Sequence, residues 1–113
     1  FEADTKTGKV TRLFQLPPPA TNAQAQEVTY HGVEAVAPNI VLAANEGRSY
    51  VDAVDVNTGK LLDRFTDVSK PCCIEQIPGT SPVRALVSNI GDATVSLVEV
   101  SGEGKIKLVA KAK

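Results

Sequence analysis

The segment VDAVDVNTGKLLDRF, residues 51–65, occurs in related form three times in the chain. A first copy lies near the start, where the pattern D-x-x-T-G-K-x-x-x-x-F begins at Asp4 as it does at Asp55. A third copy, VSLVEVSGEGK at residues 95–105, matches residues 51–60 once one residue is inserted ahead of the glycine. The aligned pairs of the second and third copies are Val51 with Val95, Asp55 with Glu99, Val56 with Val100, Gly59 with Gly104 and Lys60 with Lys105.

Each copy has the composition of a β-hairpin. A run rich in β-branched residues leads to a turn with Gly-Lys, and a second alternating run follows. The glycine accepts a left-handed backbone, and the aspartate and threonine side chains hydrogen-bond such turns, so we interpret these residues as turn-forming and not as catalytic. Internal periods of about 20 to 50 residues are typical of solenoids, propellers and arrays. The sequence therefore predicts an all-β repeat protein.

Composition excludes several classes of partner. The 113 residues suffice for about one small domain. Twelve Lys and Arg residues against thirteen Asp and Glu leave almost no net charge to attract nucleic acid or an anionic membrane surface. No apolar run approaches the roughly 20 residues of a membrane helix, and residues 1–9 lack the order of a signal peptide. We expect neither a nucleic-acid partner nor a membrane span.

The sequence also bears on processing and location. It contains no methionine, and its first residue falls inside a copy of the repeat, so we expect a processed, trimmed or partial piece of a longer polypeptide. Its two cysteines, Cys72 and Cys73, are adjacent and suggest neither a disulfide framework nor a metal cluster. Short β-rich runs with abundant Thr, Ser, Ala and Asn are typical of a secreted or periplasmic domain.

The pattern divides the chain into four segments. Residues 1–14 hold a strand end, a turn and the strand that follows, which is the outer half of one repeat unit. Residues 15–27 are a Pro-rich connector, since consecutive prolines cannot donate hydrogen bonds to a sheet. Residues 28–69 and 70–113 are two complete units of four strands. The expected strands are 29–36, 40–44, 50–56 and 60–66 in the first unit and 71–77, 83–88, 94–100 and 105–113 in the second.

The two complete units align along their whole length. Residues 71–77 lie over 30–36, which pairs Glu75 with Glu34 and Cys72 with His31. The next turn is three residues longer in the second unit, and this shifts the alignment. The later matches are 83–88 with 39–44, Asn89 with Asn45, Gly91 with Gly47 and 94–100 with 50–56.

The last strand, KIKLVAKAK, alternates lysine with apolar residues. Strict alternation predicts that Lys105, Lys107, Lys111 and Lys113 share one face. Lysines on a terminal strand guard against edge-to-edge pairing. A basic binding stripe is the alternative, but no aromatic residue is interleaved with it.

Four short antiparallel strands in about 40 to 50 residues form the blade of a β-propeller. The segments AANEGRSYVDAVDVNTGK, residues 43–60, and LVSNIGDATVSLVEV, residues 86–100, resemble the YVTN-type propeller repeat. In that family a strand ends in an Asn-x-Gly turn, and a T-V-S-V-I-D-like strand and a T-G-K turn follow. Residues 30–39, YHGVEAVAPN, are similar to the P-H-G-I-A-V-S-P-D-G opening of such blades, with Tyr30 in place of proline. The second unit has Pro-Cys-Cys, residues 71–73, where the family has Pro-His-Gly.

The resemblance implies an incomplete toroid. The chain holds about two and a half blades, whereas closed propellers generally have four to eight. An open fragment would leave the sides of its end blades bare, as a large apolar surface that soluble monomers rarely tolerate. We therefore expect the ring to be completed by further blades from other chains, from the rest of the polypeptide or from copies of this chain.

The resemblance also suggests catalytic residues. His31 is the one histidine of the sequence, and on the family layout it lies near the mouth of the central channel. Propeller lactonases, which this sequence resembles at the level of the blade, use His, Arg and Glu at that mouth to polarise a lactone carbonyl or to move its proton. This implies His31 and Glu34 as catalytic residues, with Glu75 and Arg84 as ligand-binding partners. The alternative is that His31 belongs to the repeat signature and caps a neighbouring loop.

Two further groups have alternative interpretations. Glu34 and Glu75 hold equivalent places, and facing carboxylates bind calcium through oxygen, as in propellers of the gluconolactonase type. Alternatively they are two solvated carboxylates. Cys72 either presents a ligand-binding thiol at the channel mouth, forms a strained vicinal disulfide with Cys73, or packs as a small hydrophobic residue.

These observations favour a secreted or periplasmic propeller segment that acts as a binding or structural module, with ligand contacts at one mouth of the toroid. The alternative is part of a propeller hydrolase of the lactonase type. A third hypothesis is a redox subunit whose propeller encloses a quinone or haem, although the sequence has no C-x-x-C-H. It also has no G-x-S-x-G, H-E-x-x-H, P-loop or dinucleotide motif.

Overall fold

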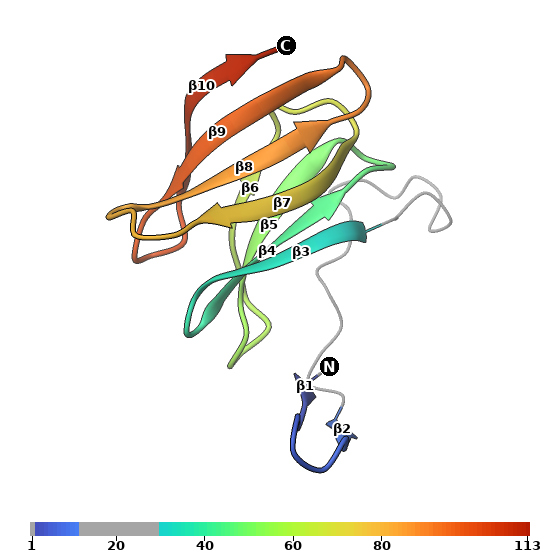
Figure 1. Ribbon diagram of the computed structural model, residues 1–113, viewed down its shortest axis with the longest axis vertical. Coiled ribbons are helices and arrows are strands. Elements are labelled where there is room, and N and C mark those ends of the chain that lie inside the picture. The colour runs from blue at the N-terminus through green and yellow to red at the C-terminus, as the bar shows by residue number, and fades with distance from the viewer. Residues whose placement is uncertain (1, 12–29) are drawn as a thin grey trace.

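The computed structural model describes residues 2–11 and 30–113, and every regular element within these ranges is a β-strand (Figure 1). This confirms the prediction of an all-β chain. None of the described residues forms a helix long and apolar enough to cross a membrane. The strands are β1 (Glu2–Ala3), β2 (Val10–Thr11), β3 (Tyr30–Ala37), β4 (Ile40–Asn45), β5 (Tyr50–Asp55), β6 (Leu61–Phe65), β7 (Pro71–Ile77), β8 (Val83–Asn89), β9 (Thr94–Val100) and β10 (Ile106–Ala112).

Eight of these strands form two four-stranded antiparallel sheets, as the repeat predicts. The first sheet has the order β3-β4-β5-β6 and the second the order β7-β8-β9-β10, so strands that follow one another in sequence are neighbours in space. β1 and β2 form a separate two-stranded hairpin. The predicted continuation of that hairpin to residue 14 and the Pro-rich connector at 15–27 lie outside the described residues.

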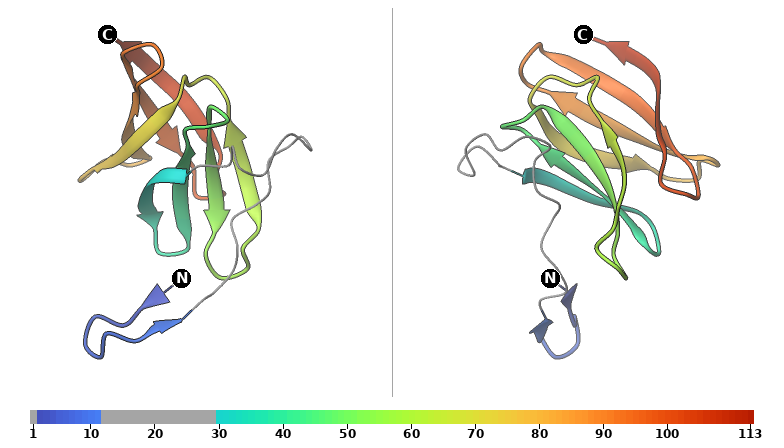
Figure 2. Two further views of the ribbon diagram at one scale, coloured as in Figure 1. Left: turned by 90° about the vertical axis from the view of Figure 1, so that its right-hand side faces the viewer. Right: turned by 180° about the vertical axis from the view of Figure 1, so that it is seen from behind.

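The two sheets are stacked so that corresponding strands meet (Figure 1 and Figure 2). β7 packs against β3 and β4, and β10 contacts β6. At the contact of β3 with β7, a Cβ atom on Gly32 would overlap the carbonyl oxygen of Cys72 and lie 3.1 Å from the Cα of Cys73. A side chain at position 32 would therefore push the two sheets apart.

The core lies between the sheets and follows from the alternation of each strand. Residues two apart on a strand share a face, so each strand contributes every second residue to the contact. The buried apolar residues of this core are Val36, Ile40, Leu42, Ala44, Val51, Ala53 and Val68 from the first sheet and the connector that follows it, and Ile74, Ala85, Val87, Val98 and Val100 from the second sheet.

The two sheets pack through unlike faces of the repeat. The first sheet buries the face that carries Leu42 and Val51. The repeat aligns these residues with Leu86 and Val95, which lie on the other face of the second sheet and are 40% and 42% exposed. The positions that the first sheet packs against the second sheet are therefore exposed on the second sheet itself. We call this exposed surface the open face, and its residues include Arg84, Leu86, Ser88, Val95, Leu97, Glu99, Ala110 and Ala112.

The D-x-x-T-G-K turns repeat in atomic detail. The side chains of Asp4 and Asp55 each accept hydrogen bonds of 2.8 to 3.2 Å from the backbone N–H groups two and three residues ahead. These donors hold the pKa of both aspartates below the usual range. In the third copy Ser101 takes the place of the aspartate, and its hydroxyl oxygen accepts hydrogen bonds from the backbone N–H groups of residues 103 and 105. The insertion thus shifts the turn so that Ser101, and not Glu99, corresponds to the aspartate.

The lysines of β10 do not share one face, which corrects the expectation from strict alternation. The register of β10 against β9 shifts across residues 108–110. Lys107 therefore pairs with Glu99, while Lys111 pairs with Ser96 and lies on the opposite face. Lys111 Nζ contacts Oδ1 of Asp67 at 2.7 Å and so ties β10 to the segment that joins the two sheets.

Candidate functional site

Three side chains with different ligand atoms converge where the starts of β3 and β7 meet. His31 lies on β3, Glu46 directly follows β4 and Cys72 lies on β7. Their ligand atoms lie within 4.8 Å of one another, and among the residues that the structure describes this is the one such group of three or more His, Cys, Asp or Glu side chains. We call these three residues the His31 cluster.

Irregularities in the two sheets position this cluster. The register of β3 against β4 shifts at His31, and the register of β7 against β8 shifts at residues 72–73. Such bulges re-aim side chains that regular alternation would direct elsewhere. Asn45, the last residue of β4, pairs with Tyr30, so Glu46 follows immediately beside His31. The repeat alignment of Cys72 with His31 thus corresponds to a physical contact between neighbouring sheets.

The distances within the cluster are short. His31 Nδ1 lies 2.8 Å from Oε2 of Glu46 and 3.9 Å from Sγ of Cys72. The histidine side chain is 46% exposed and the glutamate side chain 24%. Oε2 of Glu46 is itself buried, and although it is close to His31 Nδ1 it accepts no well-aligned hydrogen bond from any described residue. The cluster therefore combines access from solvent with a buried carboxylate oxygen that makes an ion-pair contact but no aligned hydrogen bond.

The thiol of Cys72 is not set up as a nucleophile. Cys72 and Cys73 are free, and the Cys73 thiol donates to Cys72 Sγ across 3.4 Å. This hydrogen bond is the largest of the effects that raise the pKa of Cys72. Burial and the nearby charges of Cys73 and Glu46 raise it further. Nucleophilic cysteines have a lowered pKa and an available base, whereas here the pKa is raised and the one nearby base atom, His31 Nδ1, also faces Glu46 Oε2 at 2.8 Å. The arrangement is better suited to ligation of a metal ion, which displaces the thiol proton itself.

The other predicted site residues lie apart from this cluster. Glu34 pairs with Leu42 on the face that meets the second sheet, whereas Glu75 pairs with Leu86 on the open face. Cross-strand partners share a face, so the two glutamates do not form a facing pair. Arg84 is bound to Glu99, with Nε and Nη2 at 2.9 and 2.8 Å from Oε2.

The contacts of the described residues join His31 to Glu46 and not to Glu34. A catalytic role for His31 and Glu34 stays a prediction, as does binding of calcium. Sequence reasoning missed Glu46, because it treated the turn after β4 only as a break between strands. The alignment of His31 with Cys72 is the signal that identifies the location, and Glu46 follows from the pairing of β4 with β3.

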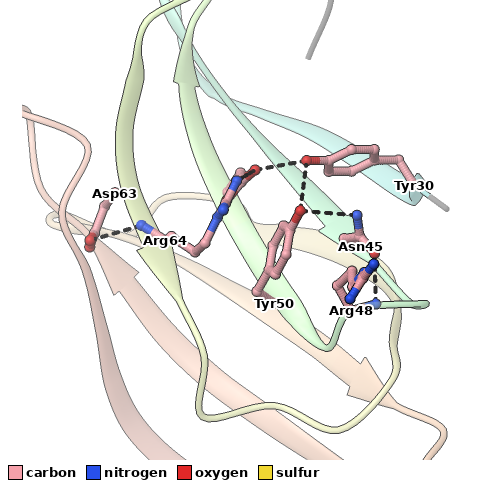
Figure 3. A network of polar contacts seen from close by, with 7 residues as sticks. Tyr30, Asn45, Arg48, Tyr50, Asp63 and Arg64 are labelled. Carbon is pink, nitrogen blue, oxygen red and sulfur yellow. Dashed lines mark hydrogen bonds and ion pairs between the residues drawn. The ribbon is translucent and has the colours of Figure 1, made fainter. Parts of the chain in front are cut away.

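A second group of polar residues, also missed, lies on the far face of the first sheet (Figure 3). Asp52 is fully buried there, and its carboxylate accepts hydrogen bonds from Arg64 Nε at 2.7 Å, Arg64 Nη2 at 3.0 Å and the hydroxyl of Tyr30 at 2.8 Å. The guanidinium of Arg64 also lies 4.0 Å from the ring centre of Tyr50. Asn45 Nδ2 donates to the hydroxyl of Tyr50 at 3.2 Å.

This far-face network has a simpler counterpart in the second sheet. Asn89 aligns with Asn45, and its Nδ2 donates to Thr94 Oγ1 at 3.0 Å and to Ser96 Oγ at 2.9 Å. The asparagine of the Asn-x-Gly turn thus fixes the strand that follows it in both sheets. Because the contacts named here join strands of one sheet, we interpret the network as structural.

A groove of about 220 Å³ lies between the sheets at the end of β3 away from His31. Its lining is mainly aliphatic and includes Val36, Ile40, Pro82 and Val100. It has no acidic, basic, histidine or cysteine side chain among its lining residues, so it offers no acid–base chemistry. The His31 cluster is therefore the candidate functional site. Comparison of the chain with protein-family models, with curated proteins and with solved structures found no match.

Proposed function

We propose that this chain supplies two adjoining blades of a β-propeller and acts as a structural and binding module. The observation that carries this proposal is the open face of the second sheet. Its positions are equivalent, in the repeat, to those that the first sheet packs against the second sheet. A third sheet of the same kind would continue the stack in the same direction, and repeated head-to-tail contacts of this type close into a ring when the rotation permits.

The chemistry of the open face supports a partner. Leu86 pairs with Leu97, and Leu97 with Ala110, which forms an apolar row across three strands. Val95 and Ala112 extend this row on one side. Soluble monomers rarely leave large contiguous apolar patches uncovered. An uncovered sheet face of this composition is therefore expected to be buried in the native particle.

The occupant that fits is a further four-stranded sheet of the same repeat. The centre of the face that the second sheet presents to the first carries small and β-branched residues, namely Ala85, Val87, Ser96 and Val98. That face already packs on the repeat-equivalent positions Leu42 and Val51. A following sheet with the same pattern would thus meet Leu86 and Val95 as the second sheet meets the first.

We place the proposed ligand contacts at one end of the two stacked sheets, where β3 and β7 start. In the proposed ring, β3 and β7 are the innermost strands, and the His31 cluster lies at their starts. We assign ligand contacts to this end because the polar groups gather there, whereas the groove at the other end is mainly aliphatic.

The composition of the native particle tests this proposal. The particle is purified from the cells that make it, its mass is measured by native mass spectrometry, and its chains are sequenced. We expect further polypeptide with Asn-x-Gly and T-G-K repeats, in the same chain or in a tightly bound one. Cross-linking from Lys107, beside the open face, is expected to reach that polypeptide. A monodisperse particle with the mass of one 113-residue chain would overturn the proposal.

A further inference from the structure

We propose that His31, Glu46 and Cys72 form a binding site for a thiophilic divalent transition metal of the zinc class. The site has three protein ligands and a fourth position open to solvent. This inference rests on residues of this chain alone and does not require the proposed ring.

The donor set selects the class of metal. The cluster offers one imidazole nitrogen, one carboxylate oxygen and one thiol sulfur. Zinc accepts all three donor types in tetrahedral sites, and sites with three protein ligands keep the fourth position for water or another ligand. Calcium and magnesium take oxygen ligands almost entirely, so a thiol and an imidazole disfavour them.

The spacing of the donors agrees with this assignment. Bond lengths of about 2.0 to 2.3 Å in a tetrahedral zinc site place pairs of ligand atoms about 3.3 to 3.6 Å apart. The distances from His31 Nδ1 to Glu46 Oε2 and to Cys72 Sγ, 2.8 and 3.9 Å, lie on either side of that spacing. Small side-chain rotations therefore suffice to admit the ion, and all three residues are at least partly accessible to solvent.

An independent observation comes from Glu46. Its Oε2 atom is buried, yet it accepts no hydrogen bond from the described residues. Its close polar neighbour is His31 Nδ1 at 2.8 Å, which is not aligned for a hydrogen bond, and a metal ion bound by both atoms would satisfy the carboxylate oxygen.

Cys73 provides a matched control within the same dipeptide. Its sulfur lies 3.4 Å from that of Cys72, but Cys73 is not a member of the converging group. Its backbone N–H donates to Ser88 Oγ at 3.1 Å, which joins this residue to the neighbouring strand β8. Substitution of Cys73 therefore removes the neighbouring thiol while it leaves the three proposed ligands in place.

Titration with Co²⁺, a spectroscopic probe for zinc sites, tests the proposal. The full-length chain is reduced, freed of metal with a chelator and titrated, and Zn²⁺ is then added. We expect a thiolate-to-cobalt charge-transfer band with the intense visible bands of tetrahedral cobalt, at one equivalent per chain, and loss of both on addition of Zn²⁺. Cys72→Ser should abolish the charge-transfer band, whereas Cys73→Ser should retain it.

His31→Gln and Glu46→Gln should each weaken Co²⁺ binding at least about 100-fold, since loss of even an outer partner of a metal site costs about 10- to 100-fold. His31 is partly exposed, so this variant is expected to fold, and circular dichroism of the metal-free proteins checks this. The proposal is overturned if reduced wild-type chain gives no charge-transfer band. It is equally overturned if the band depends on Cys73, or if His31→Gln binds Co²⁺ as the wild type does.

Discussion

Removal of the guanidinium of Arg64 should be among the most destabilising single changes in the first sheet. Arg64→Met keeps the aliphatic stem of the side chain but leaves the fully buried carboxylate of Asp52 with the hydroxyl of Tyr30 as its remaining side-chain donor among the described contacts. Breaking a buried ion pair from one side costs about 3–5 kcal/mol because it leaves an uncompensated charge. The lost contact with Tyr50 adds to this cost.

The matched control is Arg84→Met on the second sheet. Arg84 also binds a carboxylate, that of Glu99, but its side chain is 41% exposed. Exposed pairs contribute about 0–1 kcal/mol, so this variant should unfold close to the wild type. The double variant Asp52→Leu with Arg64→Met should recover most of the loss, since apolar replacement of both members of a buried pair is often neutral or stabilising.

The assay is urea unfolding of the full chain at one fixed protein concentration, followed by far-UV circular dichroism. The free energy of unfolding is obtained by linear extrapolation, and equal m-values for all variants confirm that the same transition is compared. A loss of about 3 kcal/mol corresponds to a fall in Tm of at least about 12 °C in a domain of this size. If Arg64→Met loses no more than Arg84→Met, then Asp52 is not stabilised by a buried ion pair and the interpretation of the far-face network is wrong.

Three further predictions concern packing, association and pH. Gly32→Ala should cost about 1–3 kcal/mol in urea unfolding because its Cβ would overlap the second sheet, whereas Gly102→Ala, with nothing within 4 Å, should be neutral; equal costs would contradict the close approach. Leu86→Glu should reduce self-association of the chain in sedimentation velocity, while Ile90→Glu, an exposed residue in a turn, should not. Burial, with hydrogen bonds to its neighbours, raises the pKa of Tyr30 above its ordinary value of 10.0, so the unfolded chain ionises first and the free energy of unfolding should fall as pH rises above 10. Tyr30→Phe should flatten that slope, and an unchanged slope would refute the assignment.

The strands and their pairing could be predicted because the signals for them are local. Alternation along each run, the glycine of each turn and the internal repeat are all visible within a few residues. The turn after Asp55 behaves as expected for this reason. The lysines of β10 could not be placed by alternation alone. A single extra residue in the strand moves Lys111 to the other face, and no feature of the local sequence marks that bulge.

The polar sites depend on register and on contact between sheets, which alternation does not specify. Asp52 lies in an alternating strand, where a charged residue normally indicates a solvated face. Its partner Arg64 lies directly opposite on β6, and the pair is recognisable only when the register of β5 against β6 is known. Glu46 likewise becomes part of the His31 cluster only because β7 approaches β3 closely and brings Cys72 beside His31. Gly32, which has no side chain, permits this approach.

The places where this chain departs from the repeat it resembles are also the places where its side chains make unusual contacts. Tyr30 stands where the repeat has proline, and its hydroxyl supplies the third hydrogen bond to Asp52. Cys72 stands where the repeat has histidine, and it meets the one histidine of the chain, His31, on the neighbouring sheet. A repeat that serves only to stack sheets has no need of such substitutions. Both lie at the starts of β3 and β7, the end of the stack to which we assign the proposed ligand contacts, whereas the turns at Asp4 and Asp55 keep the repeat pattern.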